Sequence, residues 1–387
     1  MKIDISGYSW DQLRSEFSFV NDVFDEPEAL KQFANYYTSI EGKSLLLQLN
    51  QDWKETRFEN VIITGMGSSL FAGHIASMIF QAAGFPCAMI DAGELLYYGL
   101  GGDESVPASD NAKTLFILTS QSGESVEIVK LLDEIPAKRP DGTIWGITNT
   151  EDSVLAIKSH RAILLKAGEE RSVTAKTFSN TLLMMYILPR ILIATSETEI
   201  DAFLNTFFDD VQGLADDLEF LFSEKQELAN KIVTFFGKDT KFVEVIARGT
   251  SLATAQQAAL NIKETNKIAS EAISGGQFRH GPIELVTKNF SSICLASDDE
   301  TRDLMEDVCY NITHKWGGGK VLFITNRQSE KLEGDARLIP VVHNCINPFL
   351  APVMEIAIIQ LFMIRLAASN NIGPGIFKYT TKVTKIG

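Results

Sequence analysis

The chain repeats part of its own sequence once, and this repeat constrains its fold more than any other feature. A β-branched run followed by a Gly-hydroxyl-Ser-Leu turn ends at Leu70 and again at Leu252. Two further apolar runs recur in the same order, at a shared offset close to that of the first run. The three pairs are Val61 to Leu70 with Glu244 to Leu252, Thr114 to Ser120 with Ser291 to Ser297, and Trp145 to Asn149 with Leu322 to Asn326. Matched runs in the same order at nearly one offset predict two similar domains.

Each half alternates short apolar runs with longer helical segments, such as Leu70 to Ala83 and Ser125 to Ile135. This alternation is typical of βαβ units, so we predict the α/β class, with a parallel sheet flanked by helices in each half. Trp10 to Trp53 and Glu197 to Asp239 are also predicted to be helical. A sheet of this kind binds its ligand in the polar turns at the carboxyl ends of its strands.

Charge and composition exclude several classes of protein. The chain has 35 Lys and Arg against 50 Asp and Glu, so a nucleic acid or an anionic membrane is not an expected partner. The apolar stretches Thr181 to Ala194 and Phe349 to Ala368 contain prolines and charged residues, which favours buried helices over membrane spans.

Four cysteines without CxxC spacing, and no apolar signal sequence at the start, favour a reducing, cytoplasmic location. No cluster of histidines or carboxylates predicts a metal, and no cofactor is expected.

Two polar loops of the first half have residues suited to binding phosphate. One is Gly65 to Ser69 and the other is Ser120 to Ser125, each between a predicted strand and a predicted helix. Glycines allow a ligand to approach the backbone, and hydroxyls with the N–H groups of the next helix bind an oxyanion. Either loop alone is equally typical of a turn or a helix cap, but two such loops favour a phosphate site. The candidate residues are Gly67, Ser68, Ser69, Ser120, Gln121, Ser122 and Ser125.

These loops resemble those of the sugar isomerase (SIS) domain family, which bind the phosphate of a phosphosugar. The segment Gly168 to Phe178 is similar to a family segment that closes over the sugar, which adds Val173 and Thr174 to the implied contacts, and Glu94 matches a recurrent position. The resemblance implies two tandem SIS domains, each a flavodoxin-like three-layer sandwich. The expected organisation is a helical lead-in at 1–54, SIS domains at 55–196 and 241–370, a helical linker at 197–240 and an active-site tail at 371–387.

The second half holds the most specific motif. Asn261 to Thr265 and then Glu271 to Pro282 align without a gap to the isomerase domain of glucosamine-6-phosphate synthase. The resemblance places Glu264 on the catalytic carboxylate, His280 on the ring-opening histidine at the same spacing as in the synthase, and Lys382 on a tail lysine that contacts the open-chain sugar. In the family the histidine reaches the site from the neighbouring subunit, which implies a homodimer. The residue types fit, because a carboxylate can move a proton between carbons and histidine titrates near neutrality.

Differences from the synthase indicate which reaction to expect. The first cysteine is Cys87, inside the first repeat, so no glutaminase domain and no glutamine-dependent synthesis are expected of this chain. Gln257 and Asn261 stand where the synthase pattern has a carboxylate and a lysine. These differences favour a deaminase of glucosamine 6-phosphate or a deglycase of fructosamine 6-phosphates. A plain phosphosugar isomerase and a non-catalytic phosphosugar sensor are the alternatives, and the retained Glu264 and His280 favour an enzyme over a sensor.

Overall fold

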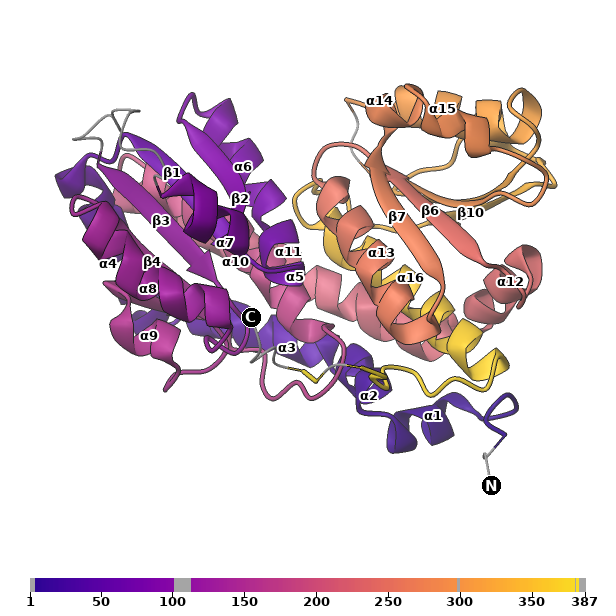
Figure 1. Cartoon of the computed structure of the whole chain (residues 1–387), viewed down its shortest axis with the longest axis horizontal. Coiled ribbons are helices and arrows are strands. Elements are labelled where there is room, and N and C mark those ends of the chain that lie inside the picture. The colour runs from indigo at the N-terminus through magenta and orange to yellow at the C-terminus, as the bar shows by residue number, and fades with distance from the viewer. Residues whose placement is uncertain (1–3, 101–112, 298–299, 380, 383–387) are drawn as a thin grey trace. The chain divides into compact units, whose positions relative to one another are not determined.

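The computed structural model describes residues 4–100, 113–297, 300–379 and 381–382 (Figure 1). The chain forms two compact units, each assembled from separate segments. The first-repeat unit consists of residues 28–169, 176–213 and 379–387, and the second-repeat unit of residues 1–27, 170–175 and 214–378.

The first-repeat unit is built on a five-stranded parallel sheet with the order β2-β1-β3-β4-β5. Its helices cover both faces, with α4, α6 and α10 packed together on one and α7, α8 and α9 on the other. The strands are β1 (Asn60–Gly65), β2 (Cys87–Asp91), β3 (Thr114–Thr119), β4 (Thr143–Thr148) and β5 (Arg161–Leu164). The helices are α3 (Glu26–Thr38), whose first two residues belong to the other unit, α4 (Ile40–Thr56), α5 (Ser68–Phe71), α6 (Gly73–Ala82), α7 (Ala92–Glu94), the π-helical turn η1 (Leu95–Gly99), α8 (Val126–Lys138), α9 (Val154–Lys158) and α10 (Lys176–Ile193).

The second-repeat unit contains a second five-stranded parallel sheet, with the order β10-β9-β8-β6-β7. Helices α13 and α16 lie side by side against it, and α14 and α15 contribute to the other face (Figure 1). The strands are β6 (Phe242–Ala247), β7 (Ala269–Ser274), β8 (Ser291–Ala296), β9 (Lys320–Thr325) and β10 (Leu338–Val342). The helices are α1 (Trp10–Glu16), α2 (Ser18–Phe24), α12 (Gln226–Phe236), α13 (Ser251–Asn266), α14 (Gly275–Phe278), η2 (Pro282–Leu285), α15 (Arg302–His314), η3 (Glu330–Leu332) and α16 (Ala351–Ser369), while α11 (Glu197–Glu224) has residues in both units.

The two sheets have the same topology, which confirms the predicted α/β repeat of two three-layer sandwiches. Strands β1, β3 and β4 occupy the places in the first sheet that β6, β8 and β9 occupy in the second. These are the three strand pairs that the sequence repeat predicts. In each sheet the chain turns in opposite directions from two adjacent strands, β1 and β3 or β6 and β8. Ligands of open α/β sheets bind at such a switch point.

One predicted helix differs from the structure. The segment Leu70 to Ala83 forms two helices, α5 and α6, separated at Ala72. A Cβ at Gly73, the first residue of α6, would lie 2.8 Å from the Ile63 side chain. The start of α6 therefore packs directly on β1, and α5 is a separate helical turn between β1 and α6.

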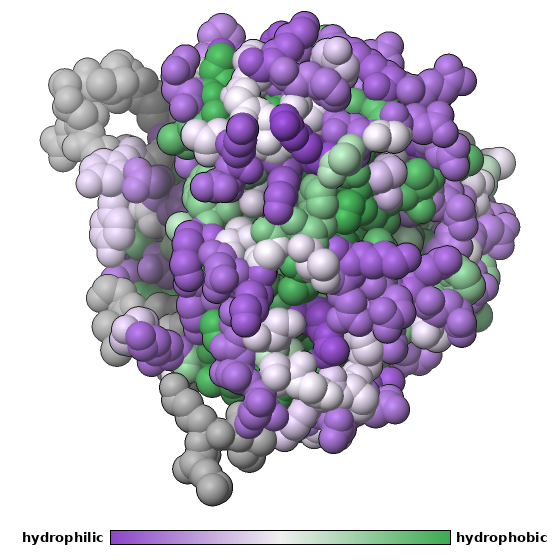
Figure 2. Space-filling model, turned by 90° about the vertical axis from the view of Figure 1, so that its right-hand side faces the viewer, coloured by the Kyte–Doolittle hydropathy of each residue, from purple (hydrophilic) through white to green (hydrophobic). Residues whose placement is uncertain are grey.

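The apolar stretch near the C-terminus is a core helix, as the sequence predicts. Among the described residues, α16 alone is long and apolar enough to cross a membrane, but 94% of its most apolar window is buried inside the protein. Hydrophilic residues predominate on the face of the molecule shown in Figure 2.

Candidate functional site

The loop after β1 approaches the neighbouring strand closely. Gly65 is paired with Thr119 at the ends of β1 and β3. A Cβ at Gly65 would lie 2.8 Å from the Thr119 carbonyl oxygen, and Gly67 has a φ of 51°, so both positions require glycine. The half-buried Ser68 and Ser69 follow in the first turn of α5. The backbone thus sets both hydroxyls at the switch point of the first sheet.

The loop after β3 is held by its own hydrogen bonds. Ser120 Oγ accepts a hydrogen bond from the Gly123 N–H at 3.1 Å and lies 3.2 Å from Ser125 Oγ. Ser122 Oγ accepts from the Glu124 N–H, and the Gln121 carbonyl accepts from the Asn149 N–H. The loop is therefore fixed against the end of β4 before any ligand arrives.

Helix α8 adds an anion-binding terminus to this loop. Ser125 is its N-cap residue, yet the Ser125 side chain makes no capping hydrogen bond to the helix. The N–H groups of the first turn carry a partial positive charge that favours an anion. Because β1 and β3 are adjacent, the structure brings both predicted phosphate loops to one switch point.

Glu94 lies exposed after the next strand, β2, where the Asp91 carboxylate caps the turn.

Glu264 lies near the C-terminal end of α13, on the same face as Gln257 and Asn261. Gln257 donates a hydrogen bond to Asn261 Oδ1 at 2.7 Å, and Asn261 Nδ2 donates to the Thr174 carbonyl oxygen at 3.0 Å. The structure therefore brings the predicted segment of Val173 and Thr174 to within about one helical turn of Glu264. The Val173 side chain is buried, and Thr174 is half-buried.

The C-terminal tail is fastened to the same end of α13. Lys267, whose φ of 59° ends the helix, donates hydrogen bonds to the carbonyl oxygens of Glu264 and Ile376. Ser172 Oγ donates to the Gly375 carbonyl oxygen at 2.6 Å. Sequence reasoning missed Lys267, which belongs to no motif, and Ser172, which lies in the segment Gly168 to Phe178 but was not among the contacts taken from it. Lys382 follows shortly after Ile376 in the chain and is half-buried.

His280 lies toward the carboxyl end of strand β7, whereas Glu264 lies toward its amino end. The last turn of α13 precedes β7, whereas His280 follows both β7 and α14 (Figure 1). The six residues of β7 span about 20 Å. Arg248 directly follows β6, and its pKa is lowered by burial and then by the charge of Arg279, the residue before His280. Within one chain the structure therefore does not bring Glu264 and His280 together.

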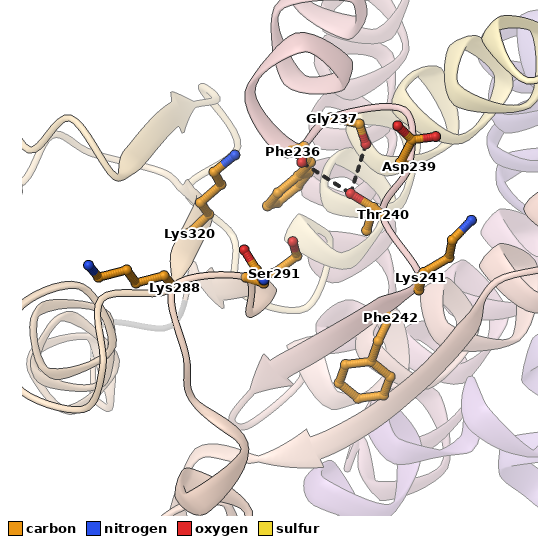
Figure 3. Close-up of a pocket in the computed structure, with 10 residues that line it drawn as sticks. Phe236, Gly237, Asp239, Thr240, Lys241, Phe242, Lys288, Ser291 and Lys320 are labelled. Carbon is orange, nitrogen blue, oxygen red and sulfur yellow. Dashed lines mark hydrogen bonds between the residues drawn. The ribbon is translucent and has the colours of Figure 1, made fainter.

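A separate hollow of about 410 Å³ lies at the amino ends of β6, β8 and β9. It contains three lysines, but Figure 3 shows the ammonium groups of Lys241, Lys288 and Lys320 pointing away from one another. Lys320 donates its hydrogen bond to the Phe235 carbonyl oxygen. The cations do not converge on a ligand there. Within the described residues, no three His, Cys, Asp or Glu side chains are grouped as a metal ion would need.

Comparison with known proteins gives a family and several relatives. The SIS domain model matches residues 57–189 and 239–369. The chain is 25% identical over 372 residues to a probable glutamine–fructose-6-phosphate aminotransferase (isomerizing) of Acanthamoeba polyphaga mimivirus. That alignment covers 94% of this chain and 57% of the relative, so the chain spans little more than half of its length.

Two solved structures show the same fold. A putative tagatose-6-phosphate ketose/aldose isomerase from Clostridium novyi superposes with a TM-score of 0.82 at 18% identity, covering all of this chain and 99% of that one. A glucosamine-6-phosphate deaminase from Thermotoga maritima superposes with a TM-score of 0.68 at 20% identity, covering 95% of this chain and 99% of that one.

Proposed function

The chain belongs to the SIS domain family, and on that basis we propose that it is an enzyme that releases an amine from a phosphosugar. The substrate is glucosamine 6-phosphate, with ammonia as the product, or a fructosamine 6-phosphate, with a larger amine as the product. Similarity to an aminotransferase of fructose 6-phosphate and to a glucosamine-6-phosphate deaminase supports a substrate that carries nitrogen.

The paired loops at the first switch point are the observation that carries this proposal. Ser69 and Ser120 follow adjacent strands, and Ser125 begins α8 with its side chain free of a capping role. Hydroxyls and N–H groups bind a phosphate without a lysine or arginine. The substrate phosphate binds to Gly67, Ser68, Ser69, Ser120, Gln121, Ser122 and Ser125.

Glu264 moves the proton in the proposed reaction. A histidine first opens the sugar ring, and Glu264 then takes a proton from one of the first two carbons and returns it to the other. This transfer converts the amine-bearing carbon into an imine. Water adds to the imine and the C–N bond breaks, which leaves a carbonyl group and a free amine. Val173 and Thr174 cover the sugar, and Lys382 contacts the open chain.

We also propose that the enzyme is a homodimer with shared sites. Glu264 precedes β7 and His280 follows it, so they lie toward opposite ends of a strand that spans about 20 Å. The His280 that serves Glu264 therefore comes from a second copy of the chain. The proposed location is the cytoplasm, in keeping with four free cysteines. No nucleic acid, membrane or cofactor takes part in the proposal.

A substrate panel tests the proposed reaction. Glucosamine 6-phosphate and several fructosamine 6-phosphates are supplied, and release of ammonia or amino acid is measured. Glu264→Gln should lower turnover on the active substrate by about 10²- to 10⁴-fold. Glu333→Gln, which removes an exposed carboxylate after η3, is the matched control and should leave turnover unchanged.

The panel also separates the alternatives. Interconversion of aldose and ketose phosphates without amine release would identify a plain isomerase, the second candidate supported by the isomerase-like fold. Binding without any turnover would identify a sensor. Near wild-type turnover by Glu264→Gln would refute the role of this carboxylate.

Mixed subunits test the shared site. Glu264→Gln and His280→Ala are each inactive in this scheme, but a mixed dimer has one site with both residues intact. Random mixing in equal amounts should restore about a quarter of the wild-type activity. If mixing restores none while mixed dimers are shown to form, the two residues do not meet across subunits.

A further inference from the structure

The switch point of the second sheet contains a buried polar network. Ser251 Oγ and Ser297 Oγ donate hydrogen bonds to the same oxygen, Oε1 of Glu355, at 2.8 and 2.7 Å. Ser251 follows β6, Ser297 follows β8, and Glu355 comes from the second turn of α16. All three residues are at least 98% buried. A carboxylate thus occupies the position between the two strand ends.

His343 extends the network. Its Nε2 lies 2.9 Å from Ser297 Oγ, and since the Ser297 proton points to Glu355, His343 Nε2 donates to Ser297. Burial lowers the pKa of His343 to about 4, so its ring is neutral near pH 7. The hydrogen bonds therefore run from His343 through Ser297 to the carboxylate, each polarising the next.

These serines are the counterparts of two residues of the proposed phosphate site. The offset of the first strand pair relates Ser251 to Ser69, and the offset of the second pair relates Ser297 to Ser120. Strands β6 and β8 hold the same places in their sheet as β1 and β3 in the other. Ser251 is also the first residue of the long helix α13, whose N-terminus favours an anion.

We propose that the second repeat contains an oxyanion-binding site of the same design as the first, and that the Glu355 carboxylate permanently fills it. The ligand class of this site is a small carboxylate. The likeness of Ser251 and Ser297 to the phosphate-binding residues Ser69 and Ser120 rests on the proposed function. The binding of the Glu355 side chain by Ser251 and Ser297 rests only on the hydrogen bonds that Glu355 accepts. Each chain accordingly offers one switch point to a phosphosugar, although it has two similar sheets.

Anchoring by Glu355 also fixes α13, which carries Glu264. The carboxylate joins the start of α13 to the end of β8 and to α16. Thr250, the residue before Ser251, donates its hydroxyl to the Pro348 carbonyl oxygen at 2.6 Å, which adds a second attachment. Glu355 is therefore a positioning residue for the helix as well as the occupant of the site.

Rescue by acetate tests the proposal. Glu355→Ala removes a CH₂–COO⁻ group, for which acetate is the free equivalent. The melting temperature of Glu355→Ala should rise with acetate relative to chloride at equal ionic strength, while wild type shows no acetate-specific rise. The variant Glu355→Ala with Ser251→Ala and Ser297→Ala should lose most of this rise. Equal responses of wild type and Glu355→Ala would overturn the proposal.

A second measurement tests the proposal if Glu355→Ala does not fold. If Glu355→Ala stays unfolded at every acetate concentration, a double-mutant cycle between Ser297→Ala and Glu355→Gln decides, because Gln keeps the size of the side chain. Coupling above the experimental error supports recognition of the carboxylate by Ser297, and additive effects overturn it. Titration of wild type with inorganic phosphate separately tests the first repeat. Failure there would reject the proposed function and leave the Glu355 result standing.

Discussion

Glu244 should make the stability of the second-repeat unit fall as the pH rises. It lies in β6, an interior strand of the second sheet, and is 1% exposed, and neither of its carboxyl oxygens has a hydrogen-bond partner among the residues that the structure describes. On the neighbouring strand β7 it is paired in register with Glu271. Burial, and then the charge of Glu271, raise the pKa of Glu244 from 4.5 to about 7.

The size of the effect follows from the pKa of Glu244. Because this pKa is higher in the folded than in the unfolded protein, the folded state holds the extra proton between about pH 4.5 and 7. Stability therefore decreases as the pH rises through this window and changes no further above it. With about 1.4 kcal/mol for each pKa unit, ionising Glu244 in the folded state costs about 3 kcal/mol.

Calorimetric unfolding of wild type and Glu244→Gln between pH 4.5 and 8.5 measures this cost. The variant should gain about 3 kcal/mol on wild type across the window, which corresponds to roughly 6–12 °C in melting temperature for a unit of this size. Subtracting the stability of wild type from that of Glu244→Gln at each pH removes the contribution of groups that titrate alike in both proteins, such as His343. Glu271→Gln should move the wild-type decrease to lower pH. Superimposable pH profiles of wild type and Glu244→Gln would refute the reasoning.

Two further predictions concern the candidate site. Ser120→Ala removes the acceptor of the Gly123 N–H and should weaken binding of inorganic phosphate by about tenfold, as measured by calorimetric titration. The control is Ser159→Ala, which should leave phosphate binding unchanged, because the Ser159 hydroxyl donates to the Leu155 carbonyl oxygen of the preceding helix. Lys267→Met removes the hydrogen bond to the Ile376 carbonyl oxygen, so backbone amides of the tail should exchange their hydrogens about fivefold faster. Unchanged exchange in the tail would show that Lys267 does not hold it.

The repeat and the alternation of elements were enough to predict the fold, because both follow from local sequence. The matched runs lie on strands in equivalent places of two sheets, and Thr181 to Ala194 and Phe349 to Ala368 largely coincide with the buried helices α10 and α16. The split between α5 and α6 was missed, because it depends on the contact of Gly73 with Ile63 on another element.

The candidate site could be predicted only where a motif marks it. The loops at Gly67 and Ser120 reach one switch point, and Thr174 lies beside the helix of Glu264. The tail contacts of Ser172 and Lys267 are made to backbone carbonyl oxygens, which leave no pattern in the sequence. The separation of Glu264 and His280 follows from the direction of β7, so their closeness in the sequence gives no measure of their distance.

The two switch points show why a loop alone does not determine what it binds. Ser69 and Ser251 follow equivalent strands, as do Ser120 and Ser297. In the second repeat, however, both hydroxyls are engaged by Glu355, which lies far beyond Ser251 in the sequence. In the proposed second site, the carboxyl group of Glu355 excludes a phosphate by volume, because both would need the same donors. In this proposal the two sheets share one design, and a single residue from a distant helix leaves only one of them open to the proposed substrate.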